Sequence, residues 1–348
     1  MVVFESDDWG SLRIPSASVK EELEQSGIDF SSNPFNYLDA LESEEDLLSL
    51  FDVLSTFKDV HGQHPVVTAN CIVANPDFDK VSASGFEEYH WESVETTYAK
   101  SEFSKNAYSI FQAGVEAGVI WPQLHGREHL NVEQWLTALR SGDKQILKAF
   151  SLGVFAIDYK NQHSQRSNFT AAFDFTSSDE SQKKEHIIRE AVTEFERLYS
   201  FRPTSFIAPC YVWHPSLESA LCNNGVKFLQ GINYQFSPDL GKSEYRRIMH
   251  TQGEKNKIGQ RYFVRNAFFE PSLNAKLDWV ENCMQRIKIA FFWGKPAIIG
   301  THRLNFIGGI SKGNREKTHE LLIQLLSRIT ETWPEVEFTT TDKLGEYY

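Results

Sequence analysis

Short apolar segments rich in β-branched residues recur along the whole chain, and longer amphipathic stretches separate them. Buried parallel strands have this apolar character, and the helices between them show apolar residues every three or four positions. The segments predict strands at residues 2–5, 66–73, 119–124, 205–208, 227–231, 262–265, 297–301 and 336–340. We therefore expect an α/β protein with a parallel sheet, and there are about as many strands as a closed β/α barrel requires.

The stretches between the strands have helical periodicity at residues 46–57, 131–140, 181–199, 274–291 and 314–332. We find no internal repeat and no linker, so the 348 residues are expected to form a single domain, 1–348. Residues 75–104 and 232–260 do not fit the alternation and are predicted to be long inserted loops. The first of them is rich in aromatic residues, on which sugar rings stack.

The overall composition excludes several classes of protein. A net charge of -12 argues against a nucleic-acid partner, and no run approaches the roughly 20 apolar residues of a membrane span. The four cysteines are widely spaced and form no CxxC pair, which predicts ordinary thiols in a reducing compartment. The first ten residues, MVVFESDDWG, contain no basic leader, so we expect a cytoplasmic protein. Its oligomeric state is not indicated.

Asp7 and Asp8 directly follow the first predicted strand. In a parallel barrel the carboxyl ends of the strands form the face where active sites are built. Adjacent carboxylates at such a position point in different directions, so one of them could bind a metal and the other could accept a proton. An Asp-Asp pair is also common at turns and helix caps, and that structural explanation is the more frequent one.

His125 and His129 follow the strand at 119–124. Their spacing of four places both imidazoles on one side of a helical turn, although among eleven histidines it arises by chance in roughly one chain in three. Together with Asp8 they would form the three-ligand set of an open catalytic site. We expect a divalent metal ion, with zinc the first choice for this donor set.

The same segment matches H-x-x-E-H, in which Glu128 would activate water in a zinc protease. That motif requires a long helix, which Pro122 and Gly126 disfavour. Two further strand ends carry candidate residues. His302 follows the strand at 297–301 and could protonate a leaving group, and Pro209 would free the following backbone N–H groups to face the site.

Taken together, these segments resemble the polysaccharide deacetylase family, also called NodB-homology proteins or carbohydrate esterase family four. The resemblance covers most of the chain, and the motifs occur in the family's order. It implies an irregular seven-stranded β/α barrel. By the resemblance Asp7 is the catalytic base, Asp8, His125 and His129 are the metal ligands, and the last residue of Gly300-Thr301-His302 is the general acid. The backbone N–H of Cys210 would stabilise the oxyanion.

The sequence departs from the family at Ile207, where the family has an Arg that supports the base. Arg265 or Arg303 is expected to supply that charge from another strand. The family's Asp- and Trp-containing motif has no clean counterpart, and Glu270 and the pair Asp278-Trp279 are both candidates.

The activity implied by the resemblance is removal of an N- or O-linked acetyl group from a carbohydrate by metal-activated water. The expected partner is therefore an acetylated saccharide. A non-catalytic member that binds carbohydrate or a partner protein is the alternative, because the motif Arg is missing. Residues expected to contact the substrate are Trp9, Trp91, Tyr211, Trp213, Arg265 and Arg303.

Overall fold

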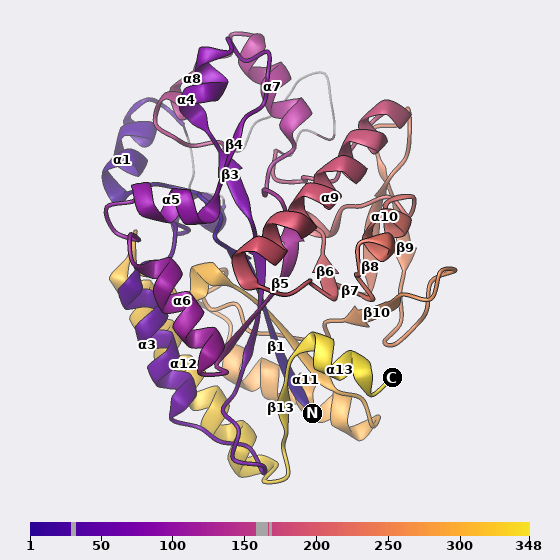
Figure 1. The fold of residues 1–348 in the computed structure, drawn as a ribbon. Helices are drawn as coiled ribbons and strands as arrows, with labels where there is room; N and C mark the ends of the chain where they lie inside the picture. The colour runs from indigo at the N-terminus through magenta and orange to yellow at the C-terminus, as the bar shows by residue number, and fades with distance from the viewer. Residues whose placement is uncertain (29–32, 158–165, 167–168) are drawn as a thin grey trace.

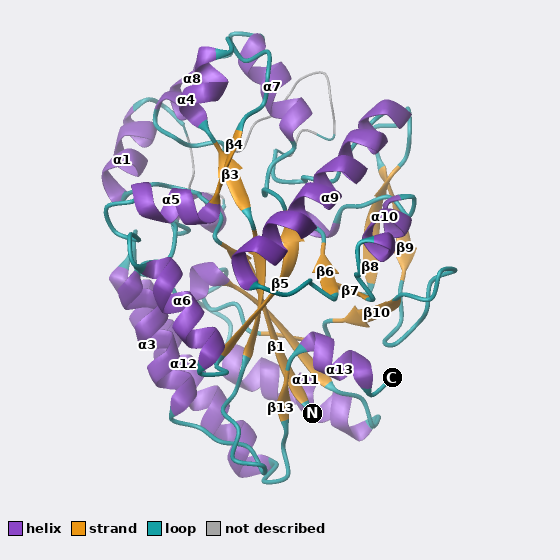
Figure 2. Ribbon diagram, viewed as in Figure 1, coloured by secondary structure: helices purple, strands orange, loops and turns teal. Residues whose placement is uncertain are grey.

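A curled sheet of parallel strands lies at the centre of the protein, and helices surround it (Figure 1; Figure 2). The computed structural model describes residues 1–28, 33–157, 166 and 169–348. Among these residues the strand order is β10-β7-β6-β5-β2-β1-β12-β11, and β13 pairs with β1. The predicted α/β class and barrel arrangement are confirmed.

All the predicted strand segments are strands in the structure. They are β1 (Val2–Trp9), β2 (Val67–Ile72), β5 (Ile120–Gly126), β6 (Ser205–Ile207), β7 (Phe228–Gly231), β10 (Arg261–Val264), β12 (Ala297–His302) and β13 (Phe338–Thr339). Sequence analysis missed β11 (Ala267–Phe268), which is only two residues long and has too few positions to show a pattern.

The two edge strands of the sheet, β10 and β11, are consecutive in the sequence. Between them, the Arg265 N–H donates to Gly231 O on β7 at 2.8 Å, and the Asn266 N–H donates to Ile298 O on β12 at 3.1 Å. The stretch 261–268 thus pairs with β7 through its first half and with β12 through its second half. One continuous piece of chain closes the wall. Counted once, and with the short β13 beside β1 left aside, it gives the seven strand positions that the resemblance implies.

The helices cover the outside of the sheet, and none of those described is long and apolar enough to cross a membrane. The predicted helices correspond to α3 (Glu44–Ser55), α7 (Val132–Arg140), α9 (Ser178–Tyr199), α11 (Trp279–Phe292) and α12 (Lys312–Thr332). The remaining helices, mostly short, are α1 (Ala17–Gln25), α2 (Pro34–Tyr37), α4 (Phe78–Ala83), α5 (Val94–Lys100), α6 (Ala107–Glu116), α8 (Lys144–Ser151), α10 (Leu217–Asn223) and α13 (Thr341–Glu346).

The first inserted segment, 75–104, is not the loop that its Pro and Gly residues suggest. It forms the antiparallel pair β3 (Ala74–Pro76) and β4 (Trp91–Ser93) together with α4 and α5. Several of its aromatic rings pack against α7 and α8 instead of facing solvent, with Phe78 5.8 Å from Trp135 and Phe86 5.2 Å from Phe150 between ring centroids. These rings belong to a buried apolar cluster above the barrel, so packing explains them.

The second inserted segment, 232–260, also contains regular structure. Strands β8 (Tyr234–Pro238) and β9 (Tyr245–Met249) form an antiparallel hairpin directly after β7. The polar and charged residues of β9 obscured the alternation of side chains that a half-exposed strand shows. The hairpin therefore stands at the carboxyl end of the barrel, beside β6 and β7 (Figure 1).

Candidate active site

Asp8, His125 and His129 converge at the carboxyl ends of β1 and β5. Asp8 Oδ1 lies 3.4 Å from His125 Nε2 and 3.1 Å from His129 Nε2. All three side chains are buried, and one donor atom from each lies within 4.8 Å of the others. Strand order brings them together because β1 and β5 both pair with β2.

The spacing of these donor atoms fits a small divalent cation. Ligands about 2.1 Å from a tetrahedral ion are roughly 3.4 Å from one another, close to the two measured separations. Burial and the nearby Arg13 lower the pKa of His129 to about 4, which keeps its imidazole in the neutral form that binds metals. Burial opposes ionisation of Asp8, but His129 and Arg13 outweigh it and hold the pKa of Asp8 well below its ordinary value.

The two imidazoles do not meet across a helical turn, as the spacing of four suggests. His125 is the penultimate residue of β5, and the chain then turns at Gly126, whose φ is +116°. An added Cβ at Gly126 would lie 3.3 Å from the Phe173 ring. The turn between strand and helix therefore needs a glycine, and it brings His129 back toward the strand end that carries His125.

Hydrogen bonds to neighbouring groups orient two of the candidate metal ligands, His125 and Asp8. His125 Nδ1 lies 2.9 Å from Ile207 O, which fixes the tautomer and leaves Nε2 with its lone pair toward Asp8. The Arg13 guanidinium lies 3.5 Å from Asp8 Oδ2, so the other carboxylate oxygen faces the imidazoles. Sequence analysis missed Arg13, because nothing in its local pattern separates it from a surface arginine.

Of the two arginines that were expected to lie near Asp7, Arg265 contacts it. The Nη1 and Nη2 of Arg265 donate to the two carboxylate oxygens of Asp7 at 2.7 and 2.6 Å. Asn70 Nδ2 donates to Asp7 Oδ1 at 2.8 Å. Burial works against ionisation, but Arg265 outweighs it and keeps the pKa of Asp7 below its ordinary value. Asp7 is therefore a carboxylate at neutral pH.

His302 lies on the other side of Asp7, with its Nε2 3.7 Å from Asp7 Oδ2. Its Nδ1 is 2.6 Å from Glu270 Oε1, and Asn305 Nδ2 donates to Glu270 Oε2 at 2.7 Å. Burial lowers the pKa of His302, but Glu270 and Asp7 outweigh this effect and raise it to about 9. Of the two candidates for the unassigned motif, Glu270 is the one at the site, whereas Asp278 caps α11 through Glu281 N.

Unusual backbone conformations cluster where the strands end at this site. Asp8, Cys210 and Tyr211 have φ of +76°, +57° and +57°, in the left-handed region that non-glycine residues seldom occupy. Such conformations cost roughly 1–3 kcal/mol each and are found mainly at functional sites. In the turn after β6 the N–H groups of Tyr211 and Val212 donate to Ala208 O and Pro209 O, so neither of these two faces the site.

Several residues that were expected to contact a substrate are buried in other interactions. Trp9 is 1% exposed and donates to Ser6 Oγ at 3.0 Å. Trp213 is 3% exposed and donates to Glu218 at 3.3 Å. Arg303 is fully buried and donates to Asp39 and Glu42. These three side chains are not accessible to a substrate, because they are buried and their polar groups are already paired within the protein.

The other expected contacts have different surroundings. Arg265 is 3% exposed and donates to Asp7 and Glu5, so its guanidinium is occupied by these two carboxylates rather than by a ligand. Tyr211 and Trp91 are partly exposed. The Tyr211 hydroxyl accepts from Arg265 Nη1 at 3.1 Å, and the Arg127 guanidinium lies over the Trp91 ring at 5.7 Å. Of these three residues, Tyr211 and Trp91 keep accessible surface.

The H-x-x-E-H segment does not have protease geometry. Residues 127–131 lie outside any helix, and α7 begins only at Val132. The Glu128 carboxylate is buried and accepts hydrogen bonds from Nε and Nη2 of Arg127. Its oxygens are therefore turned to a guanidinium instead of a catalytic water.

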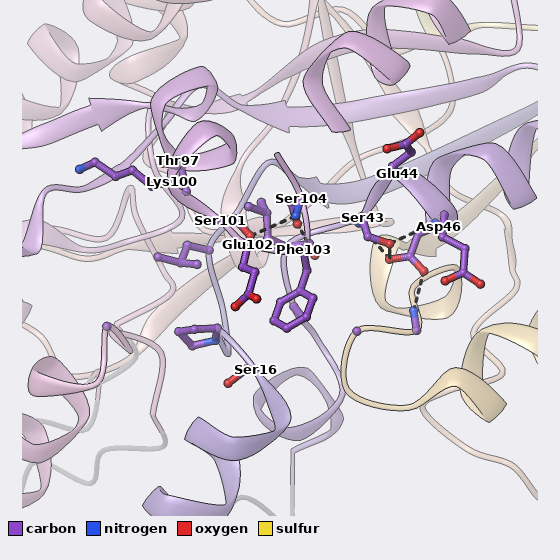
Figure 3. A pocket seen from close by; sticks show the side chains of 18 of the residues that line it. Ser16, Ser43, Glu44, Asp46, Thr97, Lys100, Ser101, Glu102, Phe103 and Ser104 are labelled. Atoms are coloured by element: carbon purple, nitrogen blue, oxygen red, sulfur yellow. Dashed lines mark hydrogen bonds between the residues drawn. The ribbon is translucent and has the colours of Figure 1, made fainter. Parts of the chain in front are cut away.

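A cavity of about 1230 Å³ lies beside the barrel, between α3, the end of α5 and residues 308–315 (Figure 3). Figure 3 shows Ser43, Asp46 and Phe103 among the side chains around it. Its described lining includes neither the three donor residues nor Asp7 or His302. This cavity is therefore separate from the candidate active site, which we identify by its three donor residues.

No protein-family model matches the sequence, and no curated protein matches it. Several solved structures similar to this chain are polysaccharide deacetylases. A probable polysaccharide deacetylase from Pseudomonas aeruginosa PAO1 is 11% identical with a TM-score of 0.45, over 99% of this chain and 89% of that one. A polysaccharide deacetylase from Bacillus cereus is 10% identical with a TM-score of 0.32, over 76% and 63%.

Another similar structure is a 4-alpha-glucanotransferase from Thermococcus litoralis, which is 9% identical with a TM-score of 0.49. The match covers 100% of this chain but only 40% of the glucanotransferase, so this chain spans less than half of that protein's length. At such identities and TM-scores, these likenesses assign no activity to the chain.

Proposed function

We propose that this protein is a metal-dependent hydrolase that removes N- or O-linked acetyl groups from a carbohydrate, with zinc as the resident metal. The observation that carries the proposal is the arrangement around Asp8. One carboxylate oxygen and two imidazole nitrogens meet at a buried point, and the Asp7 carboxyl group and the His302 imidazole lie beside it. That is the set of groups that hydrolysis of an amide or ester at neutral pH requires.

Asp8, His125 and His129 would hold the metal. A divalent cation bound there would polarise the acyl carbonyl and lower the pKa of water. Asp7 takes the proton of the attacking water, because its pKa is kept low and it is ionised at neutral pH. Arg265 and Asn70 fix the orientation of this carboxylate through three hydrogen bonds to its oxygens.

His302 donates a proton to the departing amine or hydroxyl. Its raised pKa keeps the imidazole protonated at neutral pH, and Glu270 holds Nδ1 so that Nε2 faces Asp7 and the site. The Cys210 N–H stabilises the oxyanion from the strained turn after β6. Tyr211 and Trp91 are the remaining candidates for contact with the saccharide.

Replacement of the family's arginine by Ile207 would favour a non-catalytic role if Asp7 had no cationic partner. Arg265, however, contacts both oxygens of Asp7 from the segment that closes the barrel. The geometry around Glu128 likewise gives no support to a protease. We therefore favour a catalytic protein that acts on acetylated saccharides.

The experiment that tests the proposal is acetate release from a panel of N- and O-acetylated oligosaccharides by the zinc-loaded protein. We expect turnover by the wild type, and a loss of at least about 10³-fold in Asp7→Asn and in Asp8→Ala. Metal content distinguishes the two variants, because Asp7→Asn keeps the donor set and Asp8→Ala does not. Folded, metal-loaded wild type that releases acetate from no member of the panel would overturn the proposal.

Glu128→Gln is the matched control. It removes one carboxylate between the two histidine ligands without touching a donor atom. We expect activity within about threefold of the wild type, whereas a protease of the H-x-x-E-H type would lose its activity.

A further inference from the structure

The hairpin β8–β9 is attached directly to the turn that carries Cys210. Trp213 N–H donates to Phe236 O at 3.1 Å, and Gln235 Nε2 donates to Trp213 O at 2.9 Å. Val212 also forms a parallel bridge with Phe236. Because these bonds involve the segment that immediately follows the proposed oxyanion donor, the hairpin has a fixed position at the edge of the site.

One face of this hairpin is aromatic and partly exposed. The register places Tyr234 opposite Met249 and Phe236 opposite Arg247, so these four side chains project from the same face. The Tyr234 and Phe236 rings are 5.2 Å apart, and Phe236 lies 5.9 Å from Tyr245. Rings exposed in a row beside an active site are surfaces on which sugar rings stack.

Arg247 lies over this aromatic row. Its guanidinium is 5.4 Å from the Tyr234 ring and 5.8 Å from the Phe236 ring. Among the described residues it has no carboxylate partner within 4.0 Å, although the protein carries a net charge of -12. Stacking orders the guanidinium plane while its N–H edge stays available, so an anion bound there loses little side-chain entropy.

The aromatic row leads back to the metal ligands. The Tyr245 hydroxyl donates to Asp174 Oδ2 at 2.9 Å, and Asn131 Nδ2 donates to Asp174 O at 3.0 Å. Asn131 is two residues beyond His129. These two hydrogen bonds tie the end of the aromatic row to the segment that follows His129.

We propose that the face formed by Tyr234, Phe236, Tyr245, Arg247 and Met249 is a saccharide subsite for a sugar unit that carries a carboxylate. The aromatic rings stack on the sugar, and Arg247 pairs with the carboxylate. This inference rests on the proposed deacetylation and gives its substrate class: an acidic acetylated oligosaccharide instead of a neutral one.

The test compares two acetylated tetrasaccharides of equal length, one neutral and built from N-acetylglucosamine, the other alternating N-acetylglucosamine with glucuronate. We expect the wild type to have a kcat/KM at least about tenfold higher for the acidic substrate, expressed mainly in KM. Arg247→Gln should abolish that preference, because it should lower kcat/KM for the acidic substrate to the value for the neutral one. Arg246→Gln is the matched control, because it removes the same charge from the opposite face of β9.

Binding of the acidic tetrasaccharide to metal-loaded Asp7→Asn, measured by calorimetry, separates this inference from the proposed function. Preferential binding that Arg247→Gln removes, without turnover of either substrate by the wild type, would overturn deacetylation and keep the subsite. Equal binding of both saccharides, or equal effects of the Arg246 and Arg247 substitutions, would overturn the subsite.

Discussion

Arg265 contacts both carboxylate oxygens of Asp7, with N–O distances of 2.7 and 2.6 Å, and its Nε donates to Glu5 at 2.7 Å. One guanidinium from the closing strand thus serves two buried carboxylates of β1. Planar two-point contacts of this kind fix the orientation of a carboxylate as well as its charge. Arg265 therefore links the stability of the barrel to the proposed base.

We expect Arg265→Gln to lower both stability and activity. Removing one partner of a buried ion pair costs about 3–5 kcal/mol, because Glu5 and Asp7 are left without a cation. Denaturant unfolding measures this loss, and acetate release should fall by about 10² or more. Arg265→Lys should recover part of the stability and less of the activity, since an ammonium group does not make the two-point contact. An Arg265→Gln protein as stable as the wild type would contradict the assignment.

Metal removal should destabilise the protein through Asp8 and the two imidazoles. A cation that binds only the folded state, at 100 times its dissociation constant, stabilises by about 2.7 kcal/mol. Chelation should therefore lower the melting temperature, and zinc should restore it. Asp8→Ala should show no response to either treatment. A zinc response retained in Asp8→Ala would show that the cation binds elsewhere.

The pH dependence of activity should report His302. The pKa of His302 is raised from its ordinary value of 6.5 to about 9, mainly by Glu270. The ion pair with Glu270 therefore stabilises the folded protein fully below about pH 6.5, and this stabilisation is lost as the pH rises through about 9. In Glu270→Gln the main cause of the raised pKa is gone while burial remains, so the alkaline limb of kcat/KM should move to lower pH. An alkaline limb that stays at the same pH would exclude His302 as the acid.

Gly126→Ala should weaken metal binding and stability together. The residue has a φ of +116°, and the new Cβ would lie 3.3 Å from Phe173. We expect a loss of about 1–3 kcal/mol in the free energy of unfolding and weaker zinc affinity, because the turn positions His129. Gly118→Ala is the control, since it also has positive φ, +71°, but an added Cβ there meets nothing within 4 Å. It should leave zinc affinity unchanged.

The strands and the donor set could be predicted because their signals are local. Buried parallel strands are runs of apolar residues, and candidate ligands at the ends of such runs share one face of the sheet. The separation between Asp8 and His125 in sequence was no obstacle, because the strand order itself brings β1 and β5 near one another.

The supporting residues could not be predicted in the same way. Asp7 and Arg265 are 258 positions apart, and the sequence alone could not choose between Arg265 and Arg303. That choice depends on which guanidinium faces Asp7, and Arg303 instead faces Asp39 and Glu42. Burial of Trp9 and Trp213 was missed for the same reason. The sequence around a tryptophan at a strand end does not indicate the direction in which its ring points.

The stretch 261–268 divides its pairing between β7 and β12, and Arg265 stands at the division. Neither neighbouring strand is bonded along the full length of this segment, so closure on each side depends on one half of it. A separation at either half would move the guanidinium that orients Asp7. The integrity of the wall and the orientation of the proposed base therefore depend on the same short piece of chain.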